Sequence, residues 1–168
     1  VRSTLALLRH PQLTGPQPAV RQTTQAGGIM GRTIELIHLD PQGDNARYQE
    51  CARRLVSKDK VDVLIGGITS ASREAVRPIM DRTDTLYIYT NQYEGGVCDA
   101  GMISNGAVPE QQFSTLIPYM VATYGKKVYT IAADYNFGQI SAEWNRKLVK
   151  EQGGTVVGEE FIPLGVSQ

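Results

Sequence analysis

The sequence lacks most features that commit a chain to a class of function at once. It contains only two histidines, two cysteines and one tryptophan, and its 17 basic residues balance 17 acidic ones. A chain without net charge has no basic surface for nucleic acid or for an anionic membrane. No stretch approaches the roughly 20 apolar residues of a membrane span, so no direct membrane insertion is expected. The first residues lack the apolar core of a signal peptide, as a mature chain without its signal also would.

Motifs of covalent, metal and nucleotide chemistry are also absent. The sequence has no G-x-S-x-G, no H-E-x-x-H, no paired-cysteine motif and no G-x-x-x-x-G-K-[ST]. The glycine-rich run 27–32 precedes a predicted strand, which indicates a helix-to-strand turn rather than a dinucleotide loop. We therefore expect no catalytic residue, no metal and no cofactor. Cys51 and Cys98 lie far apart, and we expect a buried thiol and a loop thiol, with a disulfide as the alternative.

The chain does contain an alternation of strand and helix patterns from residue 33 onward. Alternating apolar residues predict a strand over 33–39, and apolar residues at helical spacing predict a helix after the candidate cap Asp44. Further strands are expected at 61–65, 86–89, 127–132 and 155–162, with helices at about 70–81, from Pro109, and around 139–152. This succession predicts an α/β fold, a parallel sheet with helices on both faces.

Polar loops follow the predicted strands, at the edge where parallel sheets bind ligands. After 61–65 come Thr69, Ser70 and Ser72, at the start of a helix. Hydroxyls and free amides at a helix start form a socket for a carboxylate, carbonyl or phosphate oxygen. Helix capping is the alternative, and we expect it to account for one of these hydroxyls but not for all three.

Two further loops that follow predicted strands carry amides and aromatic rings. Tyr89, Asn91 and Gln92 follow the strand 86–89, and both carboxamides offer the donor and acceptor that complement an amide or urea. A polar turn closed by glycines is the alternative reading. Tyr135 and Phe137 follow the strand 127–132 just before a helix. Together the three loops favour a small polar ligand held by neutral hydrogen bonds and aromatic walls.

Several motifs, in order, resemble a known family. The run AGGIMGRTIELIHLDPQGDNARYQECARRLV resembles the first lobe of type I periplasmic-binding-fold proteins. More narrowly, GGITSASREAVRPI, LYIYTNQYEGG, GAVPEQQ, AADYNFG and GGTVVGEEFIPL resemble the urea and short-chain-amide branch. That branch comprises substrate-binding components of urea-type ABC transporters and an amide-sensing regulator. The resemblance covers roughly residues 26–168.

The resemblance implies a two-lobed clamp that binds a ligand without chemistry. Residues 1–123 would form the first lobe, with a shortened first helix, and 124–168 the truncated start of the second, so the fold would be incomplete. The matching positions assign ligand contact to Ser70, Tyr89, Asn91 and Tyr135, with Thr69, Gln92 and Phe137 as neighbours. Tyr93 and Glu94 would support the loop rather than touch the ligand.

The function that the resemblance implies is capture of urea, a short-chain amide or a similar small polar ligand in the periplasm, for an ABC transporter permease. One alternative is a cytoplasmic amide sensor that regulates a partner protein. Another is a branched-chain amino-acid binding protein, in which Glu94 or a residue outside this chain would hold the ammonium group. A hydrolase using Ser70 or Ser72 would lack a well-placed base. The amide sensor has a threonine-like hydroxyl at the position where this chain has Asn91, and a second tyrosine where this chain has Phe137. These two differences change the hydrogen-bond donors and acceptors of the site, so the ligand's identity stays open.

Overall fold

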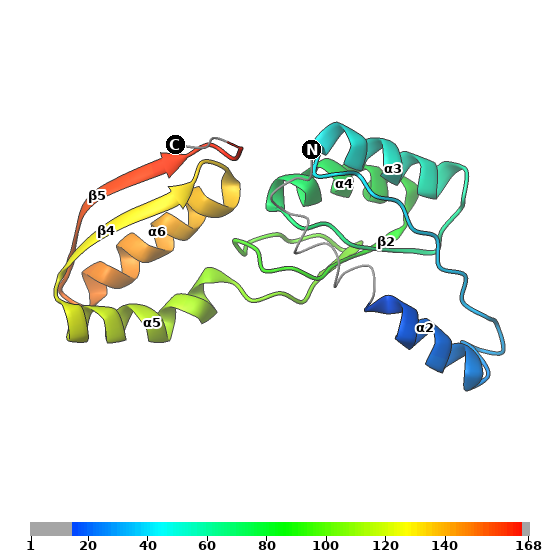
Figure 1. The fold of residues 1–168 in the computed structure, drawn as a ribbon, viewed down its shortest axis with the longest axis horizontal. Coiled ribbons are helices and arrows are strands. Elements are labelled where there is room, and N and C mark those ends of the chain that lie inside the picture. The colour runs from blue at the N-terminus through cyan, green and yellow to red at the C-terminus, as the bar shows by residue number, and fades with distance from the viewer. Residues whose placement is uncertain (1–14, 166–168) are drawn as a thin grey trace.

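The computed structural model describes residues 15–165, which form two groups of elements in Figure 1. The first unit contains α2 (Pro16–Gln25), α3 (Asn45–Ser57), β1 (Val63–Ile65), α4 (Ser70–Thr83), β2 (Leu86–Tyr89) and β3 (Met102–Ser104). The second unit contains α5 (Pro109–Tyr124), β4 (Lys127–Ala133), α6 (Asn136–Glu151) and β5 (Thr155–Ile162). The chain crosses between the two units in the segment from β3 to α5.

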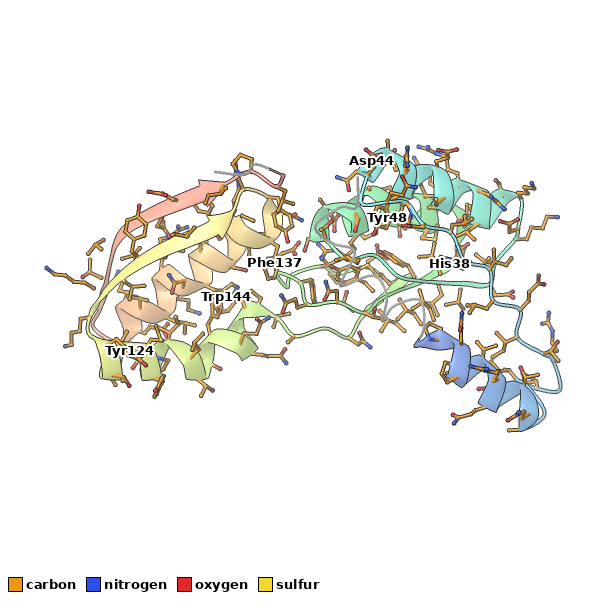
Figure 2. The ribbon with its side chains drawn as sticks, viewed as in Figure 1. His38, Asp44, Tyr48, Tyr124, Phe137 and Trp144 are labelled. Atoms are coloured by element: carbon orange, nitrogen blue, oxygen red, sulfur yellow. The ribbon has the colours of Figure 1, made fainter. Side chains whose placement is uncertain are left out.

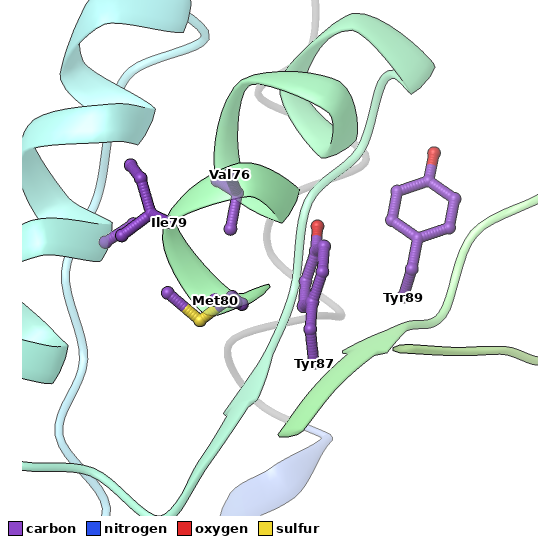
Figure 3. Close-up of a cluster of buried hydrophobic side chains, with 6 residues drawn as sticks. Val76, Ile79, Met80, Tyr87 and Tyr89 are labelled. Atoms are coloured by element: carbon purple, nitrogen blue, oxygen red, sulfur yellow. The ribbon is translucent and has the colours of Figure 1, made fainter. Parts of the chain in front are cut away.

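The first unit is built on a parallel sheet with the strand order β1-β2-β3. Helices α3 and α4 pack against each other beside this sheet, and α2 lies apart with none of its residues buried. The core is a cluster of apolar and aromatic side chains, five of them labelled in Figure 3: Ala52, Val76, Ile79, Met80, Tyr87 and Tyr89. Both tyrosines are fully buried, although each carries a polar hydroxyl. Their hydroxyls must therefore find partners inside the protein.

The second unit is a βαβ arrangement in which β4 pairs with β5 in parallel and α6 makes the crossover. Its core consists of Ile117 and Val121 from α5 and Val149 from α6. Helix α5 therefore packs with the elements that follow it. The predicted lobe boundary between residues 123 and 124 remains a prediction, but this packing favours a crossing before Pro109.

The parallel α/β architecture confirms the predicted fold class, and most elements lie where the sequence patterns place them. Strands β2 and β5 have the predicted bounds, and α6 begins three residues before the expected start. Asp44 caps α3, because its carboxylate accepts a hydrogen bond from the Arg47 amide at 2.9 Å. The run 27–32 follows α2 as a tight turn closed by a bridge between Ile29 and Arg32.

The predicted strand over 33–39 is wrong for the part of the chain that the structure describes. These residues form no ladder with any described strand, although Ile34, Ile37 and Leu39 are half-buried. The half-buried residues do not follow the period of two either, since Leu36 is exposed, and a strand also needs a hydrogen-bonding neighbour. Strand β3 was not predicted, because three residues are too few to show a period of two.

Candidate ligand-binding site

The loop after β1 is shaped by Gly66 and Gly67, which bring the backbone against two tyrosines of β2. Gly67 has φ +89°, and a Cβ there would lie 2.7 Å from the Tyr87 hydroxyl and 3.2 Å from the Tyr89 ring. Only glycine fits both the conformation and the space. The Tyr87 hydroxyl donates to the Gly66 carbonyl at 3.1 Å, so this loop satisfies a polar group of the core.

Thr69 and Ser72 form a reciprocal cap at the start of α4. The Thr69 hydroxyl accepts from the Ser72 amide at 3.0 Å, and the Ser72 hydroxyl accepts from the Thr69 amide at 3.2 Å. Capping therefore occupies two of the three hydroxyls in this loop. The expectation that capping would account for only one hydroxyl is wrong. Thr69 therefore stabilises the start of α4, at the edge of the predicted site.

Ser70 is the hydroxyl that capping does not use. Its side chain is only 1% exposed, and its hydroxyl forms no hydrogen bond within residues 15–165. It lies beside the Tyr89 hydroxyl and the Glu94 carboxylate and acts to lower the pKa of both groups, although neither contact has the geometry of a full hydrogen bond. A buried hydroxyl without a partner costs roughly 1–3 kcal/mol. Such a group at a helix start, beside amides that precede the helical ladder, is suited to meet an oxygen from outside.

Tyr89 and Asn91 converge on one backbone carbonyl in the neighbouring loop. The Tyr89 hydroxyl donates to the Ile68 carbonyl at 2.8 Å, and the Asn91 Nδ2 donates to the same oxygen at 2.6 Å. Because a carbonyl oxygen only accepts, the Asn91 amide nitrogen faces it, and Oδ1 stays available as an acceptor. Gly106 permits this arrangement, since a Cβ there would lie 1.9 Å from the Asn91 carbonyl oxygen.

A buried ion pair between Arg73 and Glu94 lies beside these loops. Arg73 is fully buried and Glu94 is 5% exposed, and both terminal guanidinium nitrogens of Arg73 face the Glu94 carboxylate. The Arg73 Cζ lies 5.2 Å from the Tyr89 ring centre and 5.3 Å from that of Tyr93. The predicted supporting residues Tyr93 and Glu94 therefore hold an arginine that sequence reasoning missed. A single arginine on a helix carries no signal that it is buried, because its partner lies 21 residues away.

The ionisation of these groups follows from their burial and their neighbours. Burial raises the pKa of the Glu94 carboxyl, but the Arg73 guanidinium, the Ser70 hydroxyl and a backbone amide together outweigh that effect, so its pKa lies below the usual range. Burial raises the pKa of Tyr89 to about 12. Burial, and then the Glu94 charge, raises the pKa of Tyr135. At neutral pH the site therefore holds two neutral phenols and a carboxylate that is already paired.

Acid is expected to remove the contribution of the Glu94 carboxylate to stability. Its pKa is lower in the folded than in the unfolded protein, so this contribution is complete above the ordinary pKa of 4.5 and is lost as pH falls through the lowered folded value. Urea unfolding of the wild type and of Glu94→Gln, from about pH 7 to about pH 3, should show their difference in unfolding free energy shrinking only below the ordinary value. A difference that does not change with pH would contradict this assignment.

The third predicted loop brings the second unit to the same place. Tyr135 precedes the first residue of α6, and its ring centre lies 6.1 Å from that of Phe137. Asn136, between them, donates from Nδ2 to the Glu94 Oε1 at 3.1 Å. Figure 2 shows Phe137 at the end of the second unit that faces the first. Glu94, in the first unit, thus accepts a hydrogen bond from Asn136 in the second unit.

The predicted ligand residues fall into two clusters. Gln92, Tyr135 and Phe137 line one groove of about 530 Å³, whose other walls come from α5, β4, α6 and the end of the second unit, so that Gln92 is its one lining residue from the first unit. Thr69, Ser70, Tyr89 and Asn91 gather around the Ile68 carbonyl and the start of α4. The ring of Tyr89 belongs to the core rather than to the groove. The roles of all seven in binding a ligand remain predictions.

The described residues 15–165 contain no candidate metal site, no disulfide and no helix that could span a membrane. No group of three or more His, Cys, Asp and Glu side chains there could hold a metal ion. Cys51 and Cys98 are free thiols, the first half-buried and the second exposed. None of the described helices is long and apolar enough to cross a lipid bilayer.

Comparison with known proteins decides the family. A family model described as "Periplasmic binding protein" matches residues 4–168. The chain belongs to the periplasmic binding protein family. This confirms the type I periplasmic binding fold that the motifs predicted, whereas the urea and amide branch stays a prediction.

Relatives in this family are longer than the chain. "Leu/Ile/Val-binding protein homolog 7" of Brucella suis is 25% identical over 95% of this chain and 43% of its own length. A periplasmic binding protein from Burkholderia mallei is 22% identical, with a TM-score of 0.79 over 92% of this chain and 43% of that one. A branched-chain amino acid transporter substrate-binding protein from Streptococcus pneumoniae, in complex with isoleucine, is 21% identical, with a TM-score of 0.80 over 99% and 48%. The chain thus spans less than half the length of these relatives.

Proposed function

We propose that the complete protein is a periplasmic solute-binding protein that captures urea, a short-chain amide or a similar small polar ligand between two lobes. The captured ligand is delivered to the permease of an ABC transporter, and it leaves the protein unchanged. The observation that carries this proposal is the buried Ser70 hydroxyl, which has no full hydrogen bond within residues 15–165, close to the loop in which Asn91 Nδ2 is bound and its Oδ1 can accept. A hydroxyl donor and a carboxamide acceptor together complement the carbonyl and the N–H groups of an amide.

The state of Glu94 favours a ligand without an ammonium group. An ammonium ligand needs a carboxylate that is not already neutralised. Glu94 is the only acid among the predicted site residues, and Arg73 holds its carboxylate while Asn136 donates to it. Urea and simple amides need no such partner, since their N–H groups can donate to neutral oxygens.

A branched-chain amino acid is the second candidate. The curated relative from Brucella suis is named for leucine, isoleucine and valine, and the solved relative from Streptococcus pneumoniae holds isoleucine. A ligand carboxylate would suit the start of α4 and the Ser70 hydroxyl as well as an amide oxygen does. None of the predicted site residues would then supply an unpaired acid for the ammonium group, since Glu94 is held by Arg73.

Isothermal titration calorimetry of the complete protein with urea, acetamide and leucine separates the two candidates. Binding of urea or acetamide, with leucine weaker by at least about tenfold, is the expected result. Ligand recovered unchanged after incubation would support binding without chemistry. A clear preference for leucine would show that the amide proposal is wrong and that the second candidate is right.

A further inference from the structure

Asn136 makes a hydrogen bond that its own helix does not require. It is the first residue of α6, and the residue before it, Tyr135, makes no side-chain cap. A polar side chain in the first turn of a helix can bond to water or to its own helix. Asn136 instead donates to Glu94, which is 42 residues earlier in the chain and belongs to the first unit.

The acceptor of this bond is held rigidly. Glu94 is 5% exposed, and Arg73 pairs with its carboxylate from a fully buried position. The rings of Tyr89 and Tyr93 lie against the Arg73 guanidinium, which restricts its position. A charged acceptor fixed by a buried partner makes a stronger and more directional hydrogen bond than a mobile surface group.

The neighbouring amide of the same helix turn makes a different kind of contact. Gln139 donates from Nε2 to Asp134 at 2.8 Å, and both residues belong to the second unit. Two carboxamides in one helical turn therefore bind carboxylates, but only that of Asn136 reaches the other unit. This difference provides a matched control.

We propose that Asn136 is a positioning residue for the ligand site. Its hydrogen bond to the Arg73-held carboxylate of Glu94 fixes the first turn of α6, and with it the rings of Tyr135 and Phe137, against the loops after β1 and β2. The consequence for ligand affinity rests on the function proposed above, whereas the consequence for the arrangement of the two units does not. Loss of one hydrogen bond to a charged group should shift the ratio of closed to open arrangements by roughly tenfold.

The test uses the complete protein with spin labels at Glu50→Cys in α3 and Lys150→Cys in α6, after Cys51→Ala and Cys98→Ser. Pulsed electron spin resonance then measures the distance between the units without ligand. Asn136→Ala and Asn136→Asp should both populate longer distances, and Gln139→Ala should match the unsubstituted protein. An aspartate suits the positive end of a helix, so a change in Asn136→Asp cannot come from loss of α6. Distances unchanged in Asn136→Asp would overturn the proposal.

Calorimetry of the same variants gives the second reading. The affinity for the ligand that binds best should fall by roughly tenfold in Asn136→Ala and stay within about twofold in Gln139→Ala. Equal losses in both variants would show a merely structural effect and would overturn the positioning role. If no tested ligand binds the unsubstituted protein, the proposed function is wrong, and the spin-label distances still decide the role of Asn136.

Discussion

Replacing Arg73 by methionine is expected to lower the free energy of unfolding by roughly 3–5 kcal/mol. Methionine retains much of the apolar stem but removes the guanidinium, so the Glu94 carboxylate is left buried without its partner. The contacts of the guanidinium with the rings of Tyr89 and Tyr93 are lost as well. Urea unfolding followed by circular dichroism measures the loss.

Two further variants separate the ion pair from the general cost of changing α4. Arg77→Met lies one turn along the same helix, at a side chain that is 31% exposed, and should cost about 1 kcal/mol or less. In the double variant Arg73→Met with Glu94→Leu, the uncompensated charge is absent, and much of the stability should return. A cost for Arg73→Met no larger than that for Arg77→Met would contradict the importance of the buried pair.

Replacing Ser70 by alanine is expected to change stability and ligand affinity in opposite directions. The unfolding free energy should rise by about 1 kcal/mol, because a buried hydroxyl without a partner is removed. The affinity of the complete protein for its ligand should fall by about tenfold or more, because the same hydroxyl donates to the ligand in our account. Thermal unfolding and calorimetry give the two readings.

Ser72→Ala is the matched control two residues along. It removes both hydrogen bonds of the Ser72 hydroxyl with the Thr69 backbone but keeps the bond from its own amide to the Thr69 hydroxyl, and it should lower the unfolding free energy by about 1 kcal/mol, with little effect on ligand affinity. The two serines should thus show crossed effects. Destabilisation by Ser70→Ala, or an unchanged affinity, would remove Ser70 from the proposed site.

The elements that the sequence predicted well are those that local patterns determine. The strand 86–89 and the helix from Pro109 carry their own periodicity and boundary residues, and the structure has both. The segment 33–39 shows the limit of that reasoning, since a strand also depends on a neighbour that periodicity does not reveal. Strand β3 was missed for a different reason, because its three residues are too few to show a period of two.

The candidate site divides in the same way. The positions of the three polar loops follow from the order of the elements, because parallel strands bring their carboxyl ends to one edge. Which hydroxyl stays free does not follow, since Thr69, Ser70 and Ser72 look alike in sequence and only the geometry of the cap distinguishes them. The pairing of Arg73 with Glu94 depends on a tertiary contact, which makes Glu94 a carboxylate already paired with an arginine rather than one open to an ammonium group.

A crystal structure of the complete protein with its preferred ligand tests the central claim most directly. The account predicts a ligand oxygen about 3 Å from the Ser70 hydroxyl, with the ring of Tyr135 approaching from the second lobe and the Arg73–Glu94 pair intact. A ligand whose ammonium group takes the Glu94 carboxylate from Arg73, or one bound away from the start of α4, would contradict it.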